Sequence, residues 1–256
     1  MSHPVFDVAG RIALVTGSSR GIGKALARGL LEAGCTVVLN GRDTGTLEAA
    51  RDELAADFPE RVHTAAFDVT DSAAVEAHVT AVEQRVGPID VLVNNTGTQQ
   101  RAPFTEFTDE QWHRLLDTNL TGSFLVGRSV ARRMTPRRRG KIVNICSLQS
   151  EAARPGIAPY SATKGGLKML TKGMCADLGP HGIQVNGIGP GYFATDLNAA
   201  LVADEEFSAW VRRRTPAGRW GEVQDLVGAL VFLSSPASDF VSGQVLYVDG
   251  GMLSVL

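Results

Sequence analysis

The sequence predicts an α/β protein of a single domain, with a doubly wound, seven-stranded parallel sheet of the Rossmann type. Three observations lead to this prediction. Short β-branched runs alternate with longer helical patterns along the chain. The runs are nearly all apolar, as expected for strands buried on both faces. The 256 residues contain neither a fixed-period repeat nor a Pro/Ser-rich linker that would divide them.

The predicted strands are four to six residues long and rich in Val, Ile, Leu and Ala. They cover residues 12–16, 36–39, 61–66, 89–93, 141–145, 184–188 and 244–248. Right-handed crossovers between parallel strands place the intervening helices on both faces of the sheet. Ligands of such sheets bind beyond the carboxyl ends of the strands. We therefore expect the functional residues directly after the strands.

The predicted helices fill the segments between these strands. They cover residues 22–33, 46–56, 73–85, 109–133, 158–178, 205–213 and 225–233. The first follows a glycine turn, and the second is rich in Ala, Leu and Glu. The helix at 158–178 is predicted although it contains Gly165 and Gly166. Strand and helix thus alternate over the whole length of the chain.

Composition excludes several classes of protein. The 25 Lys and Arg residues nearly balance 27 Asp and Glu residues, so attraction to nucleic acid or to an anionic membrane is not expected. The longest apolar run, residues 229–233, is too short to span a bilayer. Three cysteines argue against a disulfide framework and against a structural zinc site. Five scattered histidines predict no metal site. We expect a cytoplasmic protein.

A glycine turn follows the first strand. Residues 16–23 read Thr-Gly-Ser-Ser-Arg-Gly-Ile-Gly and lead into the first helix. Glycines there permit a tight turn and close approach of a pyrophosphate. The helix that follows directs its free N–H groups and the positive end of its dipole toward phosphate. The turn therefore predicts a dinucleotide site.

The glycine spacing, Gly-x-x-x-Gly-x-Gly, resembles that of the short-chain dehydrogenase/reductase family. Further motifs of that family occur in the same order after the later strands: Asn94-Asn95-Thr96-Gly97, Ser147, Tyr160-Ser161-Ala162-Thr163-Lys164 and Pro190-Gly191. The resemblance spans nearly the whole chain. Thr96 departs from it, because the family usually has alanine there. The resemblance implies a Rossmann-type reductase that assembles as a homotetramer.

The resemblance also implies which residues hold a nicotinamide cofactor. Phe193 contributes its backbone and Thr195 its hydroxyl to a loop that closes on the carboxamide, and Asp68 contacts the adenine. An N-cap role for Asp68 is equally compatible with its chemistry. The implied contacts are Gly17, Ser19, Arg20, Gly21, Ile22, Gly23, Arg42, Asp68, Val69, Asn95, Gly97, Tyr160, Lys164, Pro190, Gly191, Phe193 and Thr195.

The end of the second strand favours NADP(H) over NAD(H). An acidic residue there would hold the ribose 2′-hydroxyl of NAD, but Asn40 stands at that position. Arg20 and Arg42 are placed to contact a 2′-phosphate, although both also fit a solvated surface. Asp43, an acid near this position, is interpreted as a helix N-cap.

A proton-transfer set follows the fifth strand. Tyr160 and Lys164 lie four residues apart and share one helix face. A lysine ammonium beside a phenol favours the phenolate, so we expect Lys164 to lower the pKa of Tyr160. Ser147 holds the substrate oxygen as charge develops. By resemblance, Asn119 supports a water-linked proton path to Lys164; an exposed polar position is the alternative.

These residues predict a ketone/alcohol oxidoreductase. Hydride passes from the nicotinamide to a ketone carbon while Tyr160 donates a proton to the oxygen, and the phenolate accepts the alcohol proton in reverse. Residues 143–151 and 153–160 resemble the branch of the family that interconverts D-gluconate and 5-dehydro-D-gluconate, usually with NADP(H). The sugar acid needs a cation and polar partners. Gln149, Arg154 and Arg101 are candidates, and residues 196–214 form a predicted lid.

Two other functions remain open at this stage. A 3-oxoacyl-carrier-protein reductase has the same fold and catalytic set. The cluster of Arg132, Arg133, Arg137, Arg138 and Arg139 would suit an acidic carrier, or is a solvated loop. The other alternative is a non-catalytic, NADP-binding regulatory protein. The presence of Ser147, Tyr160 and Lys164 argues against it.

Overall fold

The fold is that of a computed structural model, which describes residues 3–195 and 198–255. Seven parallel strands form one sheet in the order β3-β2-β1-β4-β5-β6-β7. Their bounds are β1 Ile12–Val15, β2 Thr36–Gly41, β3 Val62–Ala66, β4 Ile89–Asn94, β5 Gly140–Ile145, β6 Ile183–Pro190 and β7 Val245–Val248. The predicted doubly wound α/β fold is confirmed.

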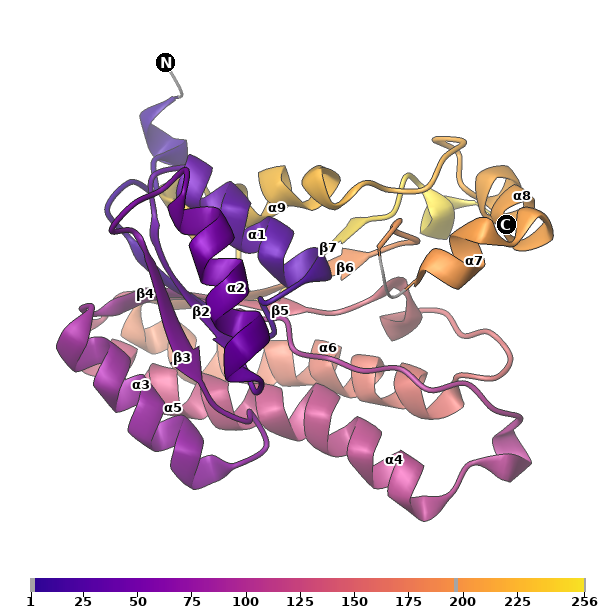
Figure 1. Cartoon of the computed structure of the whole chain (residues 1–256), viewed down its shortest axis with the longest axis horizontal. Helices are drawn as coiled ribbons and strands as arrows, with labels where there is room; N and C mark the ends of the chain where they lie inside the picture. Colours follow the sequence, from indigo (N-terminus) through magenta and orange to yellow (C-terminus); the bar gives the residue numbers. More distant parts are fainter. Residues whose placement is uncertain (1–2, 196–197, 256) are drawn as a thin grey trace.

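Helices cover both faces of this sheet (Figure 1). On one face lie α1 (Gly21–Glu32), α2 (Thr44–Ala55) and α9 (Val227–Ser234). The other face is covered by α3 (Ser72–Arg85), α5 (Gly122–Arg137) and α6 (Ala158–Leu178). Each face has its own buried apolar cluster. Alternate residues of one strand, such as Ala13 and Leu14 of β1, contribute to opposite clusters, which explains why the strands are apolar throughout.

The predicted helix at 109–133 differs from the observed one. The structure has α4 (Asp109–Leu116), a π-helical turn (Asp117–Thr121) and then α5, which continues past Pro136 to Arg137. π-Helical turns are rare and occur often at functional sites. This one contains Asn119, whose side chain is fully buried. The alternative of an exposed polar position for Asn119 is therefore wrong.

Beyond β6, two helices form a separate projection beside the C-terminal segment (Figure 1). They are α7 (Ala199–Ala203) and α8 (Glu205–Arg214). The predicted helix at 205–213 corresponds to α8, whereas α7 was not predicted. Val211 of α8 packs with Leu148 and Met252 in a third buried apolar cluster. The C-terminal segment thus anchors α8 near the carboxyl end of β5.

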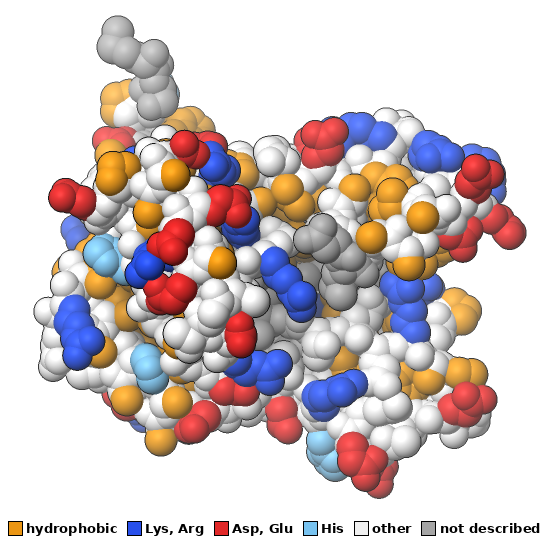
Figure 2. Space-filling view, in the orientation of Figure 1, with side chains coloured by type: hydrophobic (Ala, Val, Ile, Leu, Met, Phe, Trp, Pro, Cys, Tyr) orange, Lys and Arg blue, Asp and Glu red, His pale blue; other side chains and the backbone are white. Residues whose placement is uncertain are grey.

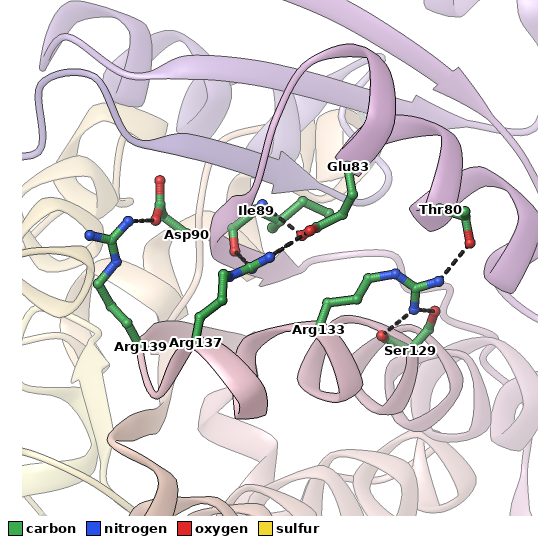
Figure 3. Close-up of polar contacts among 8 residues, drawn as sticks. All are labelled: Thr80, Glu83, Ile89, Asp90, Ser129, Arg133, Arg137 and Arg139. Carbon is green, nitrogen blue, oxygen red and sulfur yellow. Dashed lines mark hydrogen bonds and ion pairs between the residues drawn. The ribbon is translucent and has the colours of Figure 1, made fainter.

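Most of the arginines near the end of α5 are exposed, as expected of a solvated segment, but three of them also have acidic partners. Arg133 contacts Glu76 of α3 at 2.8 Å, and Arg137 contacts Glu83 at 2.5 Å. Arg139 contacts Asp90 at 2.6 Å. Figure 3 shows Arg137 and Arg139 directed at their carboxylates, while Arg133 also reaches Thr80 and Ser129. These pairs connect α5 to α3 and β4, so these side chains have structural partners.

Candidate active site

The candidate site lies where the strand order reverses. β1 pairs with β2 on one side and with β4 on the other. After β1 the chain forms α1 on one face of the sheet, and after β4 it continues to α5 on the other face. The carboxyl ends of β1, β4, β5 and β6 carry the predicted motifs. In the space-filling view, Lys and Arg side chains lie in the middle of the face shown (Figure 2). That distribution suits an anionic ligand.

The glycine turn has the shape that a dinucleotide requires. Gly17 and Gly21 adopt φ values of 61° and 55°, where other residues are strained. A Cβ on Gly21 would meet no atom within 4 Å, so space is open above the start of α1. On Gly23, a Cβ would lie 2.2 Å from the carbonyl oxygen of Gly17. The turn is therefore closely packed below and open toward a phosphate, which fits a dinucleotide cofactor.

Asn95 fixes the turn from the neighbouring strand. Its Nδ2 donates to the carbonyl oxygens of Thr16 and Gly17, both at 2.9 Å, and its backbone N–H donates to Thr16 Oγ1. The side chain of Thr96 packs under Gly17, and its Oγ1 is buried without a hydrogen-bond partner among the described residues. Asn95 thus holds the backbone of the glycine turn in its observed conformation.

Asn40 is not placed as the sequence argument assumed. It is buried, and its Nδ2 donates to the carbonyl oxygens of Ala65 and Phe67. The side chain therefore bridges β2 to the end of β3. The next residue, Gly41, has no side chain, and a Cβ there would lie 3.7 Å from Ser19 Oγ. The end of β2 still has no carboxylate side chain. This holds for both of its last positions, since one is Asn40 and the other is Gly41.

Arg42 and Asp68 lie beside this position. The Arg42 side chain is 78% exposed and contacts Asp68 at 3.3 Å. Asp68 accepts hydrogen bonds from the N–H and hydroxyl of Thr70, whereas the N-cap of α3 is Asp71. The N-cap role considered for Asp68 is therefore wrong. Asp43 caps α2 by accepting from the N–H of Thr46, as predicted.

The predicted proton-transfer residues meet at the end of β5. Ser147 follows this strand and is nearly buried, and Tyr160 and Lys164 come from the first turns of α6. Lys164 Nζ donates to the carbonyl oxygen of Ile145 at 2.6 Å and lies 5.9 Å from the centre of the Tyr160 ring. A Cβ on Gly97 would lie 3.8 Å from Lys164 Nζ and 3.5 Å from Asn119 Oδ1. The four residues thus share one site.

Asn119 is held by the loop after β4 and by α6. Its Oδ1 accepts from the N–H of Thr98 at 2.7 Å, and its Nδ2 donates to Thr98 O and Thr163 Oγ1. These bonds use the whole side-chain amide. The π-helical turn directs Asn119 inward. The side chain therefore connects this turn to the loop after β4 and to α6.

The pKa of Tyr160 shifts in the direction opposite to the prediction. Burial raises the pKa of Tyr160 above its ordinary value, and a hydrogen bond with Ser147 opposes that rise. The predicted lowering by Lys164 is wrong for the protein as it stands. Lys164 is itself buried, which lowers its pKa to about 8. Its Nζ is directed at Ile145 O, not held against the phenol oxygen.

Gln149 bonds to Ser147, and Tyr192 lies near Gln149, Arg154 and Arg101. Ser147 Oγ donates to Gln149 Oε1 at 2.6 Å. The Arg154 guanidinium lies 5.6 Å from the ring centre of Phe207, and its Nε is buried without a partner. Arg101 is exposed, and partial desolvation together with the charge of Arg154 lowers its pKa. Within residues 3–195 and 198–255, neither arginine has an acidic partner within 4 Å. The pair forms a locally positive edge.

The loop after β6 lies against the segment before α9. Phe193 is buried and forms a parallel bridge with Gly221, and its carbonyl oxygen accepts from Asn198. Thr195 is half-buried and precedes the gap in the described chain. Of the predicted lid, residues 196–197 lie outside the described residues, and α7 and α8 account for most of the remainder.

Sequence reasoning missed one part of the site. The ring of Tyr192 contacts three aromatic rings, those of Phe207, Trp210 and Trp220, on α8 and just beyond it. These residues are distant in sequence and follow no common spacing. Only the enrichment of aromatic residues in segment 192–220 gave any signal.

Neither a metal centre nor a membrane-spanning helix occurs in the part of the chain that the structure describes. No group of three or more His, Cys, Asp or Glu side chains there is arranged to hold a metal ion. None of the helices in residues 3–195 and 198–255 is both long and apolar enough to cross a membrane.

The chain is similar to known proteins over its whole length. A family model described as enoyl-(acyl carrier protein) reductase matches residues 17–253. A gluconate 5-dehydrogenase of Gluconobacter oxydans is 59% identical over 253 residues, which are 98% of both chains. A 5-keto-D-gluconate 5-reductase of Escherichia coli is 51% identical over 251 residues, again 98% of both chains. The crystal structure of a gluconate 5-dehydrogenase from Burkholderia cenocepacia, in complex with NADP and tartrate, has a TM-score of 0.96. It is 54% identical, with 99% of both chains covered.

Proposed function

Because the chain belongs to the short-chain dehydrogenase/reductase family, we propose that it interconverts D-gluconate and 5-dehydro-D-gluconate with NADP(H). The observation that carries this proposal is the meeting of Ser147, Tyr160 and Lys164 beside an open glycine turn. Two relatives with 51% and 59% identity bear names of this activity. The regulatory alternative gains no support, because the whole catalytic set is assembled.

Each residue has a defined task in the proposed reaction. NADPH, held at the glycine turn, would supply the hydride for the ketone carbon. Tyr160 donates its proton to the carbonyl oxygen, and its raised pKa keeps the phenol protonated for this direction. Ser147 holds the oxygen as negative charge develops. Lys164 and Asn119 support the site from below, where Lys164 Nζ donates to Ile145 O and the Asn119 amide bonds to Thr98 and Thr163.

We place the substrate carboxylate near Arg101 and Arg154. The two guanidinium groups are near enough for the charge of Arg154 to lower the pKa of Arg101, and a carboxylate between them would relieve this repulsion. Arginine forms paired hydrogen bonds with carboxylates. Gln149 adds a polar group beside Ser147 for a hydroxyl. The Burkholderia protein forms a complex with tartrate, which is also a hydroxy acid with carboxylates, and this supports the choice of ligand class.

The proposed substrate is tested by comparing rates of NADPH oxidation with two ketones. We expect 5-dehydro-D-gluconate to be reduced with the higher kcat/KM, by at least about a hundredfold, over an acetoacetyl thioester, because the thioester has no carboxylate for the arginines. Faster reduction of the thioester would favour the carrier-protein alternative. The carrier-protein alternative is also weakened by the structure. Three of the five arginines proposed to bind an acidic carrier are paired with acidic side chains of this chain.

The proposed preference for NADP(H) depends on Arg42. Arg42→Ala is expected to raise KM for NADPH roughly ten- to hundredfold, because a charge-assisted contact to the 2′-phosphate is lost, with little effect on KM for NADH. Arg51→Ala serves as the control, since Arg51 forms surface ion pairs with Glu48 and Asp52. An equal rise in KM for both cofactors would refute the assignment.

We also propose a cytoplasmic homotetramer. Large apolar side chains are exposed on the outer helices of one face, namely Trp112 on α4, Phe124 on α5 and Met169 on α6. Association of identical helix faces would cover them. All three cysteines are free, which suits a reducing compartment.

A further inference from the structure

The first turn of α8 places an aromatic ring against an arginine of the loop between β5 and α6. Phe207 lies in this turn, where its N–H donates to the side chain of the N-cap residue Asp204 at 3.0 Å. The guanidinium carbon of Arg154 lies 5.6 Å from the centre of the Phe207 ring. A cation within about 6 Å of a ring centre is attracted by the negative face of the ring. This contact therefore joins α8 to the loop that carries Arg154.

The ring of Phe207 is itself held by other aromatic rings. Its centroid lies 5.6 Å from that of Tyr192 and 5.5 Å from that of Trp210. A third ring, that of Trp220, lies 6.2 Å away, and its Nε1 donates to Ser208 Oγ at 3.1 Å. Contacts among several rings restrict both the position and the tilt of each one. The Arg154 guanidinium thus rests on a ring whose place is set by its neighbours.

Phe207 is also packed close to a residue of the proposed reaction. It lies against the buried apolar cluster that contains Leu148 and Val211. Leu148 directly follows Ser147, whose hydroxyl is proposed to hold the substrate oxygen. The same packing therefore places α8 beside the end of β5 and places the Phe207 ring against Arg154.

The two arginines proposed for the carboxylate come from loops that are bonded to each other. The N–H of Ala102 donates to the carbonyl oxygen of Gly156 at 3.2 Å. Arg101 and Arg154 lie next to these positions, one in each loop. The Nε of Arg154 is buried and has no hydrogen-bond partner among the described residues. At this atom, packing and the ring contact hold the side chain in place of a hydrogen bond.

We infer that Phe207 is a positioning residue for substrate recognition, because its ring holds the Arg154 guanidinium where it binds the carboxylate of the sugar acid. The inference rests on the proposed function. A guanidinium that lies over a ring face keeps its N–H edge for a planar partner such as a carboxylate. α8 thereby takes part in the choice between acidic and neutral ketones. If Phe207 only filled space, loss of its ring would affect both kinds of ketone equally.

A pair of ketones that differ only in charge tests this inference. L-Sorbose is 5-dehydro-D-gluconate with a hydroxymethyl group in place of the carboxylate, so it lacks the group that Arg154 is proposed to bind. Phe207→Leu is expected to raise KM for 5-dehydro-D-gluconate about tenfold, the effect of losing one cation–ring contact. Its kcat, and kcat/KM for L-sorbose, should not change. Phe207→Tyr, which keeps the ring, should retain the wild-type KM.

A double-mutant cycle shows whether Phe207 acts through Arg154. Arg154→Met is expected to raise KM for 5-dehydro-D-gluconate roughly a hundredfold. Phe207→Leu should then have no further effect, because no guanidinium remains to be positioned. Phe58→Leu is the matched control, since Phe58 is also half-buried and has the guanidinium carbon of Arg61 5.2 Å from its ring centre, just beyond α2.

Three results would overturn the inference. One is an equal rise in KM for both ketones with Phe207→Leu. Another is a Phe207→Tyr variant as impaired as Phe207→Leu. The third is an effect of Phe207→Leu that persists in the Arg154→Met background. A rise in KM for the acid alone, absent from Phe58→Leu and from the Arg154→Met background, supports it.

Binding of tartrate separates failure of this inference from failure of the proposed function. Tartrate is a hydroxy acid, and its calorimetric titration into the protein with NADP⁺ requires no turnover. If 5-dehydro-D-gluconate is not reduced, the proposed function is wrong, yet about tenfold weaker tartrate binding by Phe207→Leu still supports the inference. If the ketone is reduced and Phe207→Leu changes neither KM nor tartrate affinity, only the inference is wrong. A wild-type protein that neither reduces the ketone nor binds tartrate refutes both.

Discussion

Tyr160→Phe is expected to lower kcat by about a thousandfold in both directions, because it removes the only hydroxyl proposed to exchange a proton with the substrate oxygen. The phenylalanine ring fits the same space. Lys164 Nζ keeps its bond to Ile145 O, so the floor of the site should not move. NADPH binding, measured by fluorescence titration, should therefore change little. A lower kcat with unchanged NADPH affinity would therefore show that the substitution affects proton transfer and not cofactor binding.

Tyr247→Phe is the control for this test, because the Tyr247 hydroxyl donates to Glu151 and has no proposed role in the reaction. Phenylalanine at 160 should lower kcat about a thousandfold, whereas phenylalanine at 247 should leave kcat unchanged. A Tyr160→Phe variant that retains wild-type kcat would refute the assignment of the general acid. Weak NADPH binding by that variant would instead indicate a disturbed site.

The second large effect is expected from Gly23→Ala. The new Cβ would lie 2.2 Å from Gly17 O and 2.4 Å from Asn95 Nδ2, closer than atoms can approach. Both neighbours belong to the framework of the turn, because Asn95 Nδ2 donates to Gly17 O. The turn must therefore move. We expect a loss of about 3 kcal/mol in the free energy of unfolding and at least roughly tenfold weaker NADPH binding.

Gly228→Ala is the matched control for that substitution. Gly228 is exposed on α9, and a Cβ there would meet no atom within 4 Å. Alanine favours the helix over glycine, so the control should be neutral or more stable by up to about 1 kcal/mol. Chemical denaturation of both variants measures the difference. Equal stability and equal NADPH affinity for Gly23→Ala and wild type would show that the turn does not need glycine there.

The fold could be predicted because its signals are local. Each strand is a short apolar run, and the glycine turn is contiguous in sequence. Ser147, Tyr160 and Lys164 could be named because they match motifs of the short-chain dehydrogenase/reductase family and follow the carboxyl end of β5. Parallel strands bring such positions to one edge without further information. Here, the order of elements determines the site.

The predictions that were wrong concern contacts between segments that are distant in the sequence. The raised pKa of Tyr160 reflects burial, which one helix face does not reveal. Asn40 is engaged by carbonyl groups at the end of β3, about 25 residues further along the chain. The arginines at and just beyond the end of α5 find acidic partners on α3 and β4. Side chains that meet across elements leave no periodic signal, so their partners appear only in the structure.

A crystal structure of the protein with NADP⁺ and gluconate tests the central claim most directly. The account requires the Tyr160 hydroxyl within about 3 Å of the substrate oxygen at C5, with the nicotinamide C4 facing the same carbon. A substrate or nicotinamide ring bound away from Tyr160 would contradict it.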